Sequence, residues 1–93
     1  MVSIEKKKIQ IVDNIVFTEL DDEICIFDSI STDYINLNET ASEIWKMIDG
    51  NLKFEEIIDS LIIKYDIKKS DCIKEVNKFL SSFLEKGFLT IKQ

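Results

Sequence analysis

The chain has 93 residues, with 12 basic residues that are all lysine, 18 acidic residues and no histidine, which gives a formal net charge of −6. This length predicts one domain, 1–93, with a single modest core and no separate catalytic lobe. An acidic surface without arginine repels phosphate backbones and lacks the planar side chain that reads guanine edges, so nucleic-acid binding is disfavoured.

Nothing in the sequence indicates export or a membrane. The chain contains neither an apolar run of about 18 residues nor a signal-peptide pattern, so we expect a cytoplasmic protein. Lys6, Lys7 and Lys8 lie in an N-terminal segment, 1–14, that we expect to be loose. Three lysines are fewer than the roughly four to eight of a polybasic membrane anchor.

Residues suited to catalysis or metal binding are few. The two cysteines, Cys25 and Cys72, have no histidine to join them, and a zinc site takes about four ligands. We expect both cysteines to be buried, reduced thiols. The sequence has no glycine-rich phosphate loop and no serine in a strained turn between glycines, so we expect no enzyme, no metal site and no cofactor.

The first elements expected along the chain are three strands, because residues up to 37 are rich in β-branched and aromatic types with period-two stretches. In the second strand, Ile24 and Ile26 point to one side, and Cys25 and Phe27 point to the other. A strand that is apolar on both faces is normally central and covered on both sides. The strands are expected at 15–20, 23–28 and 33–37.

Short turns between these strands predict an antiparallel meander with the third strand at an edge of the sheet. The chain contains no proline to block that edge, although Asp33 discourages indiscriminate pairing. Seven acids and no lysine lie between Glu19 and Glu39, both included. These acids form either a solvated rim of the sheet or a functional acidic patch.

Three helices and a short final strand are expected in the second half of the chain. Asn38 is a suitable N-cap for the first helix, Gly50 is the expected left-handed residue after it, and Asn51 is a candidate N-cap for the second. Ser70 is expected to cap the third helix, which ends at Gly87. The expected ranges are about 39–48, 54–64 and 71–86 for the helices and 88–91 for the strand.

The third helix carries a wide apolar arc. At 100° per residue its apolar positions span about 140°, more than the roughly 100° that core packing requires. One edge of the arc could therefore line a groove beside the sheet, or the whole arc could fill the core. If Ile73, Leu80 and Leu84 pack inward, the groove is lined by Cys72, Phe79 and Phe83, and the opposite assignment is also open.

A motif at the junction of the third strand and the first helix resembles a known family. The segment 33–41 reads DYINLNETA and is followed by Ile44-Trp45 and Asp49-Gly50. This order resembles the PqqD family, the small peptide-carrier proteins of pyrroloquinoline quinone biosynthesis, whose fold recurs in recognition elements for ribosomally made precursor peptides (RiPP recognition elements). Further matches follow downstream: Glu55-Glu56-Ile57-Ile58, Leu61, Tyr65-Asp66, Val76, Phe79-Leu80 and Gly87-Phe88-Leu89.

The resemblance implies a winged helix-turn-helix-like α+β fold, with an N-terminal three-stranded antiparallel sheet followed by three helices. It also implies a stand-alone, non-catalytic protein that binds the leader of a precursor peptide by β-strand addition to its third strand, against the third helix. Lys53 departs from the family pattern, which has threonine or serine as the N-cap of the second helix. Carried over by position, the peptide-binding residues are Thr32, Asp33, Tyr34, Ile35, Asn36, Cys72, Glu75, Val76, Phe79 and Phe83.

The resemblance further implies a second partner, to which the leader is presented: a peptide-modifying enzyme such as a radical S-adenosylmethionine (SAM) protein, a leader peptidase or a cyclase. The acidic stretch 19–39 would favour a leader that carries lysine or arginine near its recognised segment. The open third strand could also pair with itself and form a homodimer.

Two other functions remain open, a general protein–protein adaptor and a winged-helix DNA-binding module. The adaptor would use the same open edge for a different partner. The DNA-binding module would need a basic recognition face, but acids at 71, 75 and 85 offset the lysines at 74, 78 and 86 of the third helix.

Overall fold

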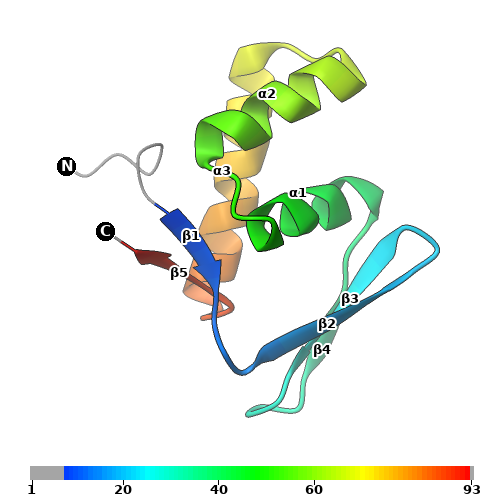
Figure 1. The fold of residues 1–93 in the computed structure, drawn as a ribbon, viewed down its shortest axis with the longest axis vertical. Coiled ribbons are helices and arrows are strands. Elements are labelled where there is room, and N and C mark those ends of the chain that lie inside the picture. Colours follow the sequence, from blue (N-terminus) through cyan, green and yellow to red (C-terminus); the bar gives the residue numbers. More distant parts are fainter. Residues whose placement is uncertain (1–7, 93) are drawn as a thin grey trace.

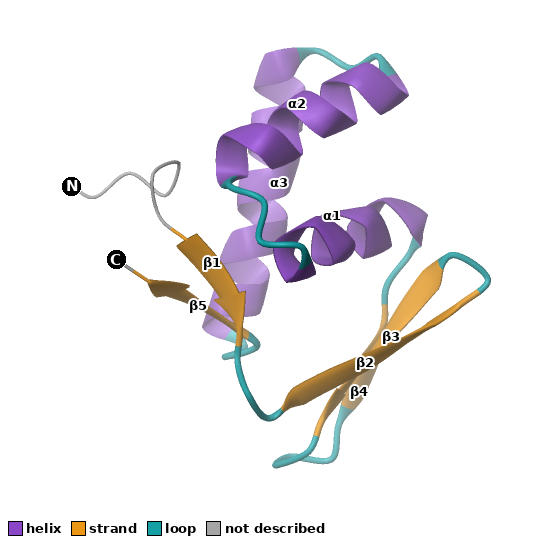
Figure 2. Cartoon of the chain, viewed as in Figure 1, coloured by secondary structure: helices purple, strands orange, loops and turns teal. Residues whose placement is uncertain are grey.

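The computed structural model describes residues 8–92, which form a flat fold of 36 × 35 × 19 Å. A three-stranded antiparallel sheet in the order β2–β3–β4 lies on one side of α1, and a two-stranded sheet, β1–β5, lies near the end of α3 (Figures 1 and 2). The predicted α+β order, a three-stranded antiparallel sheet followed by three helices, is confirmed. The elements are β1 (Lys8–Ile11), β2 (Ile15–Leu20), β3 (Glu23–Asp28), β4 (Tyr34–Asn36), α1 (Glu39–Asp49), α2 (Phe54–Tyr65), α3 (Lys69–Glu85) and β5 (Leu89–Lys92).

One face of the three-stranded sheet packs against the helices. Phe17, Ile26 and Ile35 are neighbours across β2, β3 and β4 on this face, and Ile26 is fully buried. The Phe17 ring makes a T-shaped contact with the fully buried Trp45 of α1, at a centroid distance of 5.8 Å. This sheet face and α1 therefore share one core, to which α2 and α3 also contribute.

The opposite, outer face of the sheet is not covered by any described residue. Val16, Phe27 and Tyr34 form a cross-strand row on this face, and all three are exposed. The central position of β3 is confirmed, but the expectation that both of its faces are covered is wrong, because the helices pack on one side only. Cys25, also on the outer face, is half-buried rather than buried, whereas Cys72 is buried as predicted.

The first helix begins where the sequence predicts it. Asn38 Oδ1 accepts a hydrogen bond from Ala41 N–H at 2.9 Å, so Asn38 is the N-cap of α1. The helix stops at Gly50, but Gly50 has a φ of −79°, and the left-handed residue is Asn51, with a φ of 66°. The conformation expected for Gly50 is therefore wrong, because an asparagine tolerates the left-handed region and adopts it instead.

The starts of α2 and α3 also differ from the prediction. The N-cap of α2 is Lys53 rather than Asn51, and the Lys53 main-chain N–H donates to Glu56 Oε1 at 2.8 Å. The N-cap of α3 is Lys68, so Ser70 lies inside the first turn and does not cap the helix. A lysine side chain has no acceptor to offer a helix start, so both helices depend on packing of their apolar faces.

The two ends of the described chain pair with each other. In the β1–β5 sheet, Ile9 lies opposite Ile91 and is buried. The expectation of a loose N-terminal segment is therefore wrong for Lys8–Ile11, and the two lysines before it lie outside the described residues. α3 ends at Glu85, one residue before the predicted end, and Gly87, with a φ of 80°, turns the chain into β5.

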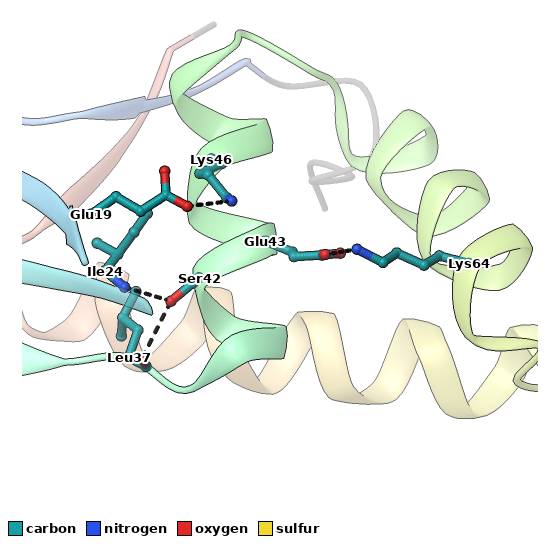
Figure 3. A network of polar contacts seen from close by, with 7 residues as sticks. All are labelled: Glu19, Ile24, Leu37, Ser42, Glu43, Lys46 and Lys64. Carbon is teal, nitrogen blue, oxygen red and sulfur yellow. Dashed lines mark hydrogen bonds and ion pairs between the residues drawn. The ribbon is translucent and has the colours of Figure 1, made fainter. Parts of the chain in front are cut away.

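Ser42, which is fully buried in α1, joins that helix to the sheet. Its hydroxyl accepts from Ile24 N–H at 2.8 Å and donates to Leu37 O at 3.2 Å (Figure 3). Figure 3 also shows two ion pairs of α1: Lys46 with Glu19 of β2, and Glu43 with Lys64 of α2. α1 thus fixes the position of the sheet relative to the other helices.

Candidate functional site

The outer edge of β4 has no partner strand among residues 8–92, because β4 pairs only with β3. Just after β4, Leu37 N–H donates to Ile24 O at 2.8 Å. Hydrogen-bonded and non-hydrogen-bonded pairs alternate along an antiparallel ladder, so the main chain of Ile35 faces β3, whereas the N–H and C=O groups of Tyr34 and Asn36 face outward. β4 therefore offers two donors and two acceptors at a free edge.

The turn before β4 is held in place by Asp28. Its carboxylate accepts from the Asn14 side chain at 2.8 Å and from Ile30 N–H at 2.9 Å. The Ile30 N–H, and next the Asn14 side chain, hold the pKa of Asp28 below its usual value of 3.8. Thr32, a predicted site residue, has a φ of 66° in this turn and donates its N–H to Asp28 O at 2.8 Å. The structure thus gives Thr32 a part in fixing the start of β4.

A cavity of about 430 Å³ opens between the start of β4 and the end of α3. Ile35 points into the fold and is half-buried, whereas the Tyr34 side chain is 69 % exposed at the outer face. Polar and apolar groups both line the cavity, so it can accept a side chain of either kind. We call it the strand cavity, and its lining residues are Asp28, Ser31, Asp33, Tyr34, Ile35, Lys86 and Phe88.

The apolar arc of α3 is divided between the core and its flanks. Phe79 is half-buried, and Glu75 is exposed. Neither of the two simple assignments is correct, because the core takes the middle of the arc and leaves both of its edges partly exposed. The core takes Cys72, Val76, Leu80 and Phe83, and the partly exposed flanks are Ile73, Phe79 and Leu84.

A row of aromatic rings links α3 to the strand cavity. The Phe79 and Phe83 rings have centroids 4.6 Å apart, and the Phe83 and Phe88 rings have centroids 5.7 Å apart. Phe88 lines the strand cavity, and Phe79 is the half-buried end of the row. The row therefore connects a partly exposed flank of α3 with the cavity beside β4.

A second cavity, of about 360 Å³, lies between the three helices beside the first half of α3. Burial raises the pKa of the Cys72 thiol, which keeps this side chain uncharged. The Tyr65 hydroxyl is buried and has no hydrogen-bond partner within the described part of the chain. We call this the helix cavity, and its lining residues are Thr40, Ile44, Leu61, Tyr65, Ile67, Cys72, Glu75 and Val76.

The ten predicted site residues are divided between these features. Three of them line the strand cavity and three line the helix cavity, while Thr32, Asn36, Phe79 and Phe83 line neither. Of the residues that line the strand cavity, Asp28, Ser31, Lys86 and Phe88 were not predicted as site residues. Phe88 belongs to the Gly-Phe-Leu motif after α3, so it carried a usable signal, whereas nothing in the sequence distinguished Lys86 from the other surface lysines.

Acidic side chains predominate in the segment that contains β2, β3 and β4. No lysine occurs between residues 9 and 45, whereas nine acids do. Within residues 8–92, no group of three or more histidine, cysteine, aspartate or glutamate side chains could hold a metal ion. In the same range, no helix is long and apolar enough to cross a membrane.

The family described as coenzyme PQQ synthesis protein D (PqqD) matches residues 23–89, which is most of the chain. The chain belongs to the PqqD family. The resemblance seen in the sequence is therefore confirmed, and the matched PqqD segment runs from the start of β3 into β5. No curated protein matches the chain in sequence.

Two solved structures share the fold of this PqqD-family chain. "TbiB1 in Complex with the TbiA(beta) Leader Peptide" is 25 % identical, with a TM-score of 0.83 over 86 % of this chain and 93 % of that chain. "Lasso peptide synthetase B1 complexed with the leader peptide" is 20 % identical, with a TM-score of 0.82 over 88 % of this chain and 96 % of that chain. The second similarity establishes the fold alone.

Proposed function

We propose that this PqqD-family chain is a non-catalytic protein that captures the leader region of a ribosomally synthesised precursor peptide and presents it to a modifying enzyme. The observation that carries the proposal is the free edge of β4, where the main chain of Tyr34 and Asn36 faces outward beside the strand cavity. Similarity to TbiB1, which was solved with a leader peptide, supports the kind of ligand. Because such precursors are made on ribosomes, the proposed place of action is the cytoplasm.

The leader would bind as one more strand of the sheet. Its main chain would exchange hydrogen bonds with Tyr34 and Asn36, which demands little of its sequence. Side chains alternate along a strand, so every second leader side chain would point toward the strand cavity and α3. Val76 lines the helix cavity, and Lys86 lines the strand cavity. At 1.5 Å per residue they are about 15 Å apart along the axis of α3, a distance that about five extended residues of the leader would span.

The predicted site residues would contribute in different ways. Ile35 and Phe79 are half-buried, so their remaining surface is available to the inward side chains of the leader. Glu75 is exposed at the helix cavity and would face a polar or basic leader group. Thr32 and Asp33 would shape the start of the strand. The buried members, Cys72, Val76 and Phe83, would support these contacts from below.

The mechanism would be tethering. A protein that holds the leader and also contacts the modifying enzyme raises the effective concentration of the remaining precursor at that enzyme's active site. No reactive group is required of the tether itself. The enzyme served would be a radical SAM protein, a leader peptidase or a cyclase.

The test is a fluorescence-anisotropy titration with labelled leader peptides from precursors encoded near this gene. Asn36→Pro removes one outward N–H and leaves the β3–β4 hydrogen bonds intact, and Asn36→Ala is the matched control that keeps the N–H. One net hydrogen bond is worth about 1 kcal/mol, so we expect Asn36→Pro to bind at least about fivefold more weakly. Asn36→Ala should bind almost as well as the wild type.

The outcomes separate the parts of the proposal. If the folded wild-type protein binds no leader, the proposal fails and a general adaptor remains. If both variants bind as tightly as the wild type, leader capture stands but strand addition at β4 does not. Sedimentation in the presence and absence of leader tests the homodimer, because self-pairing through β4 would compete with the leader for the same edge.

A further inference from the structure

The outer face of the β2–β3–β4 sheet is an exposed apolar surface. Val16, Phe27 and Tyr34 lie side by side across the three strands, with exposed fractions of 52, 38 and 69 %. Leu20, at the far end of β2, is 71 % exposed. A sheet face that meets water normally carries polar residues, so the fold itself does not require these side chains. We call Val16, Leu20, Phe27 and Tyr34 the outer patch.

Negative charge borders the outer patch. Asp21 and Asp22 form the turn beside Leu20, and Glu23 lies directly opposite Leu20 on β3. Asp33 precedes β4 at the other end of the sheet. No lysine occurs between residues 9 and 45, so β2, β3 and β4 supply no basic side chain to neutralise these acids. The patch is therefore an apolar centre with an acidic rim.

This charge pattern selects the kind of partner. Two copies of the chain packed through the outer patch would bring two acidic rims together, and each chain carries a net charge of −6. Like charges placed opposite each other disfavour such an interface. A protein surface with an apolar centre and a rim of lysine or arginine would be complementary.

We infer that the outer patch docks the peptide-modifying enzyme, through an apolar surface of the enzyme that is ringed by lysine and arginine. The inference rests on the proposed function, which requires a second protein partner. A leader strand added to β4 would continue the sheet, and its outward side chains would emerge beside Tyr34 and Asn36 on this same face. The enzyme would therefore contact the patch and the leader together.

The size of the patch fits a reversible contact. A six-residue strand is about 20 Å long, and three strands span roughly 10–15 Å. This is the scale of a transient encounter and not of an obligate interface. A weak, salt-sensitive contact suits a carrier that must release the enzyme after each precursor has been modified.

The test is biolayer interferometry with the purified modifying enzyme encoded beside this chain, and with the full chain in solution. Phe27→Thr removes the central ring and keeps a good strand former, and Ile63→Thr is the matched control, because Ile63 is 84 % exposed on α2. We expect Phe27→Thr to weaken enzyme binding about tenfold and Ile63→Thr less than about twofold. Leader affinity, measured by anisotropy, should stay unchanged in both variants.

A second variant protects the test against misfolding. Leu20→Lys changes a residue that is 71 % exposed and places a positive charge against the basic rim of the partner, so it should also weaken docking. The inference is overturned if the enzyme does not bind the wild type, or binds both patch variants as tightly as the wild type. A dimer of this chain that dissociates in Phe27→Thr would overturn it in favour of a second copy. If no leader binds but docking is lost in both patch variants, the proposed function fails and the docking surface stands.

Discussion

The main-chain N–H of Ile24 donates to the hydroxyl of Ser42 at 2.8 Å, and both residues are buried. The same hydroxyl donates to Leu37 O at 3.2 Å, so one side chain of α1 fastens β3 and the residue after β4. We expect Ser42→Ala to lower the free energy of unfolding by about 1–3 kcal/mol, because the buried Ile24 N–H loses its acceptor. Urea denaturation measures this change. Ser81→Ala, at an exposed position of α3, should change it by no more than about 0.5 kcal/mol, and equal effects would contradict the prediction.

Phe79 and Phe83 contact each other, but replacing them should affect leader binding and the free energy of unfolding differently. Phe83 is 6 % exposed, so Phe83→Ala should cost about 3–5 kcal/mol in urea denaturation. Phe79 is half-buried, so Phe79→Ala should cost less than half as much. Because we place Phe79 against the leader, its removal should weaken leader binding about tenfold in an anisotropy titration. Unchanged leader affinity in a folded Phe79→Ala variant would remove this residue from the site.

Asp33 should make leader binding sensitive to salt. It lies at the strand cavity and is exposed, and a leader with lysine or arginine near its recognised segment would pair with it. A surface ion pair contributes about 0–1 kcal/mol, so we expect Asp33→Asn to weaken binding up to about fivefold at low salt and hardly at all at high salt. Titrations at about 20 and 300 mM salt measure this difference. Asp59→Asn on α2 is the control. A wild-type leader affinity that is the same at low and high salt would count against the prediction.

Asp28 should make the turn before β4 sensitive to acid. Its pKa is lowered in the folded protein, first by the Ile30 N–H and next by the Asn14 side chain. The stabilisation is therefore fully present above the usual carboxyl pKa of 3.8 and is lost as the pH falls through the lower folded value. Thermal melts followed by circular dichroism should show a Tm difference between wild type and Asp28→Asn at pH 7 that shrinks toward pH 2.5. A difference that stays constant with pH would exclude the carboxylate as its cause.

Replacement by alanine should change the free energy of unfolding differently at the two glycines of the chain. Gly87 has a φ of 80°, so a Cβ there is strained and Gly87→Ala should cost about 1–2 kcal/mol, although no atom lies within 4 Å of the added carbon. Gly50 has a φ of −79°, and its added Cβ would approach Lys46 O at 3.4 Å, close to an ordinary contact. Gly50→Ala should therefore be neutral or stabilise by up to about 1 kcal/mol. Urea denaturation of both variants checks the pair.

The sequence predicted the central sheet well because its alternation is strong and its turns are short. The ranges of β2 and β3 agree with the prediction, and β4 is only one residue shorter at each end. β1 was not predicted, because its four residues, KIQI, include only two apolar side chains and its partner lies at the other end of the chain. Such a strand has no local signal and exists only through its pairing.

The site was less accessible to sequence reasoning than the fold. The helical period correctly placed Cys72, Val76 and Phe83 on an apolar face of α3, but it could not tell which edge of that face the core would take. The core took the middle of the arc, which leaves Phe79, at one edge, half-buried. Likewise, the apolar outer face of β3 led to the expectation of a covering layer. Nothing in the sequence shows that the three helices pack on one side of the sheet only.

We expect the chain to fold in two stages, because β1 pairs with a strand from the other end of the chain. Ile9 meets Ile91 across almost the whole length of the described chain, whereas β2 pairs with β3, β3 with β4, and α2 packs on α3 as neighbours in sequence. Closing a long loop costs more chain entropy than closing a short one, so the β1–β5 ribbon should form last and open first. A molecule with this ribbon open would still hold β4 and the outer patch in place. Fluctuations at the joined ends would therefore reach the strand cavity through Phe88, which directly precedes β5, and leave the outer patch unchanged.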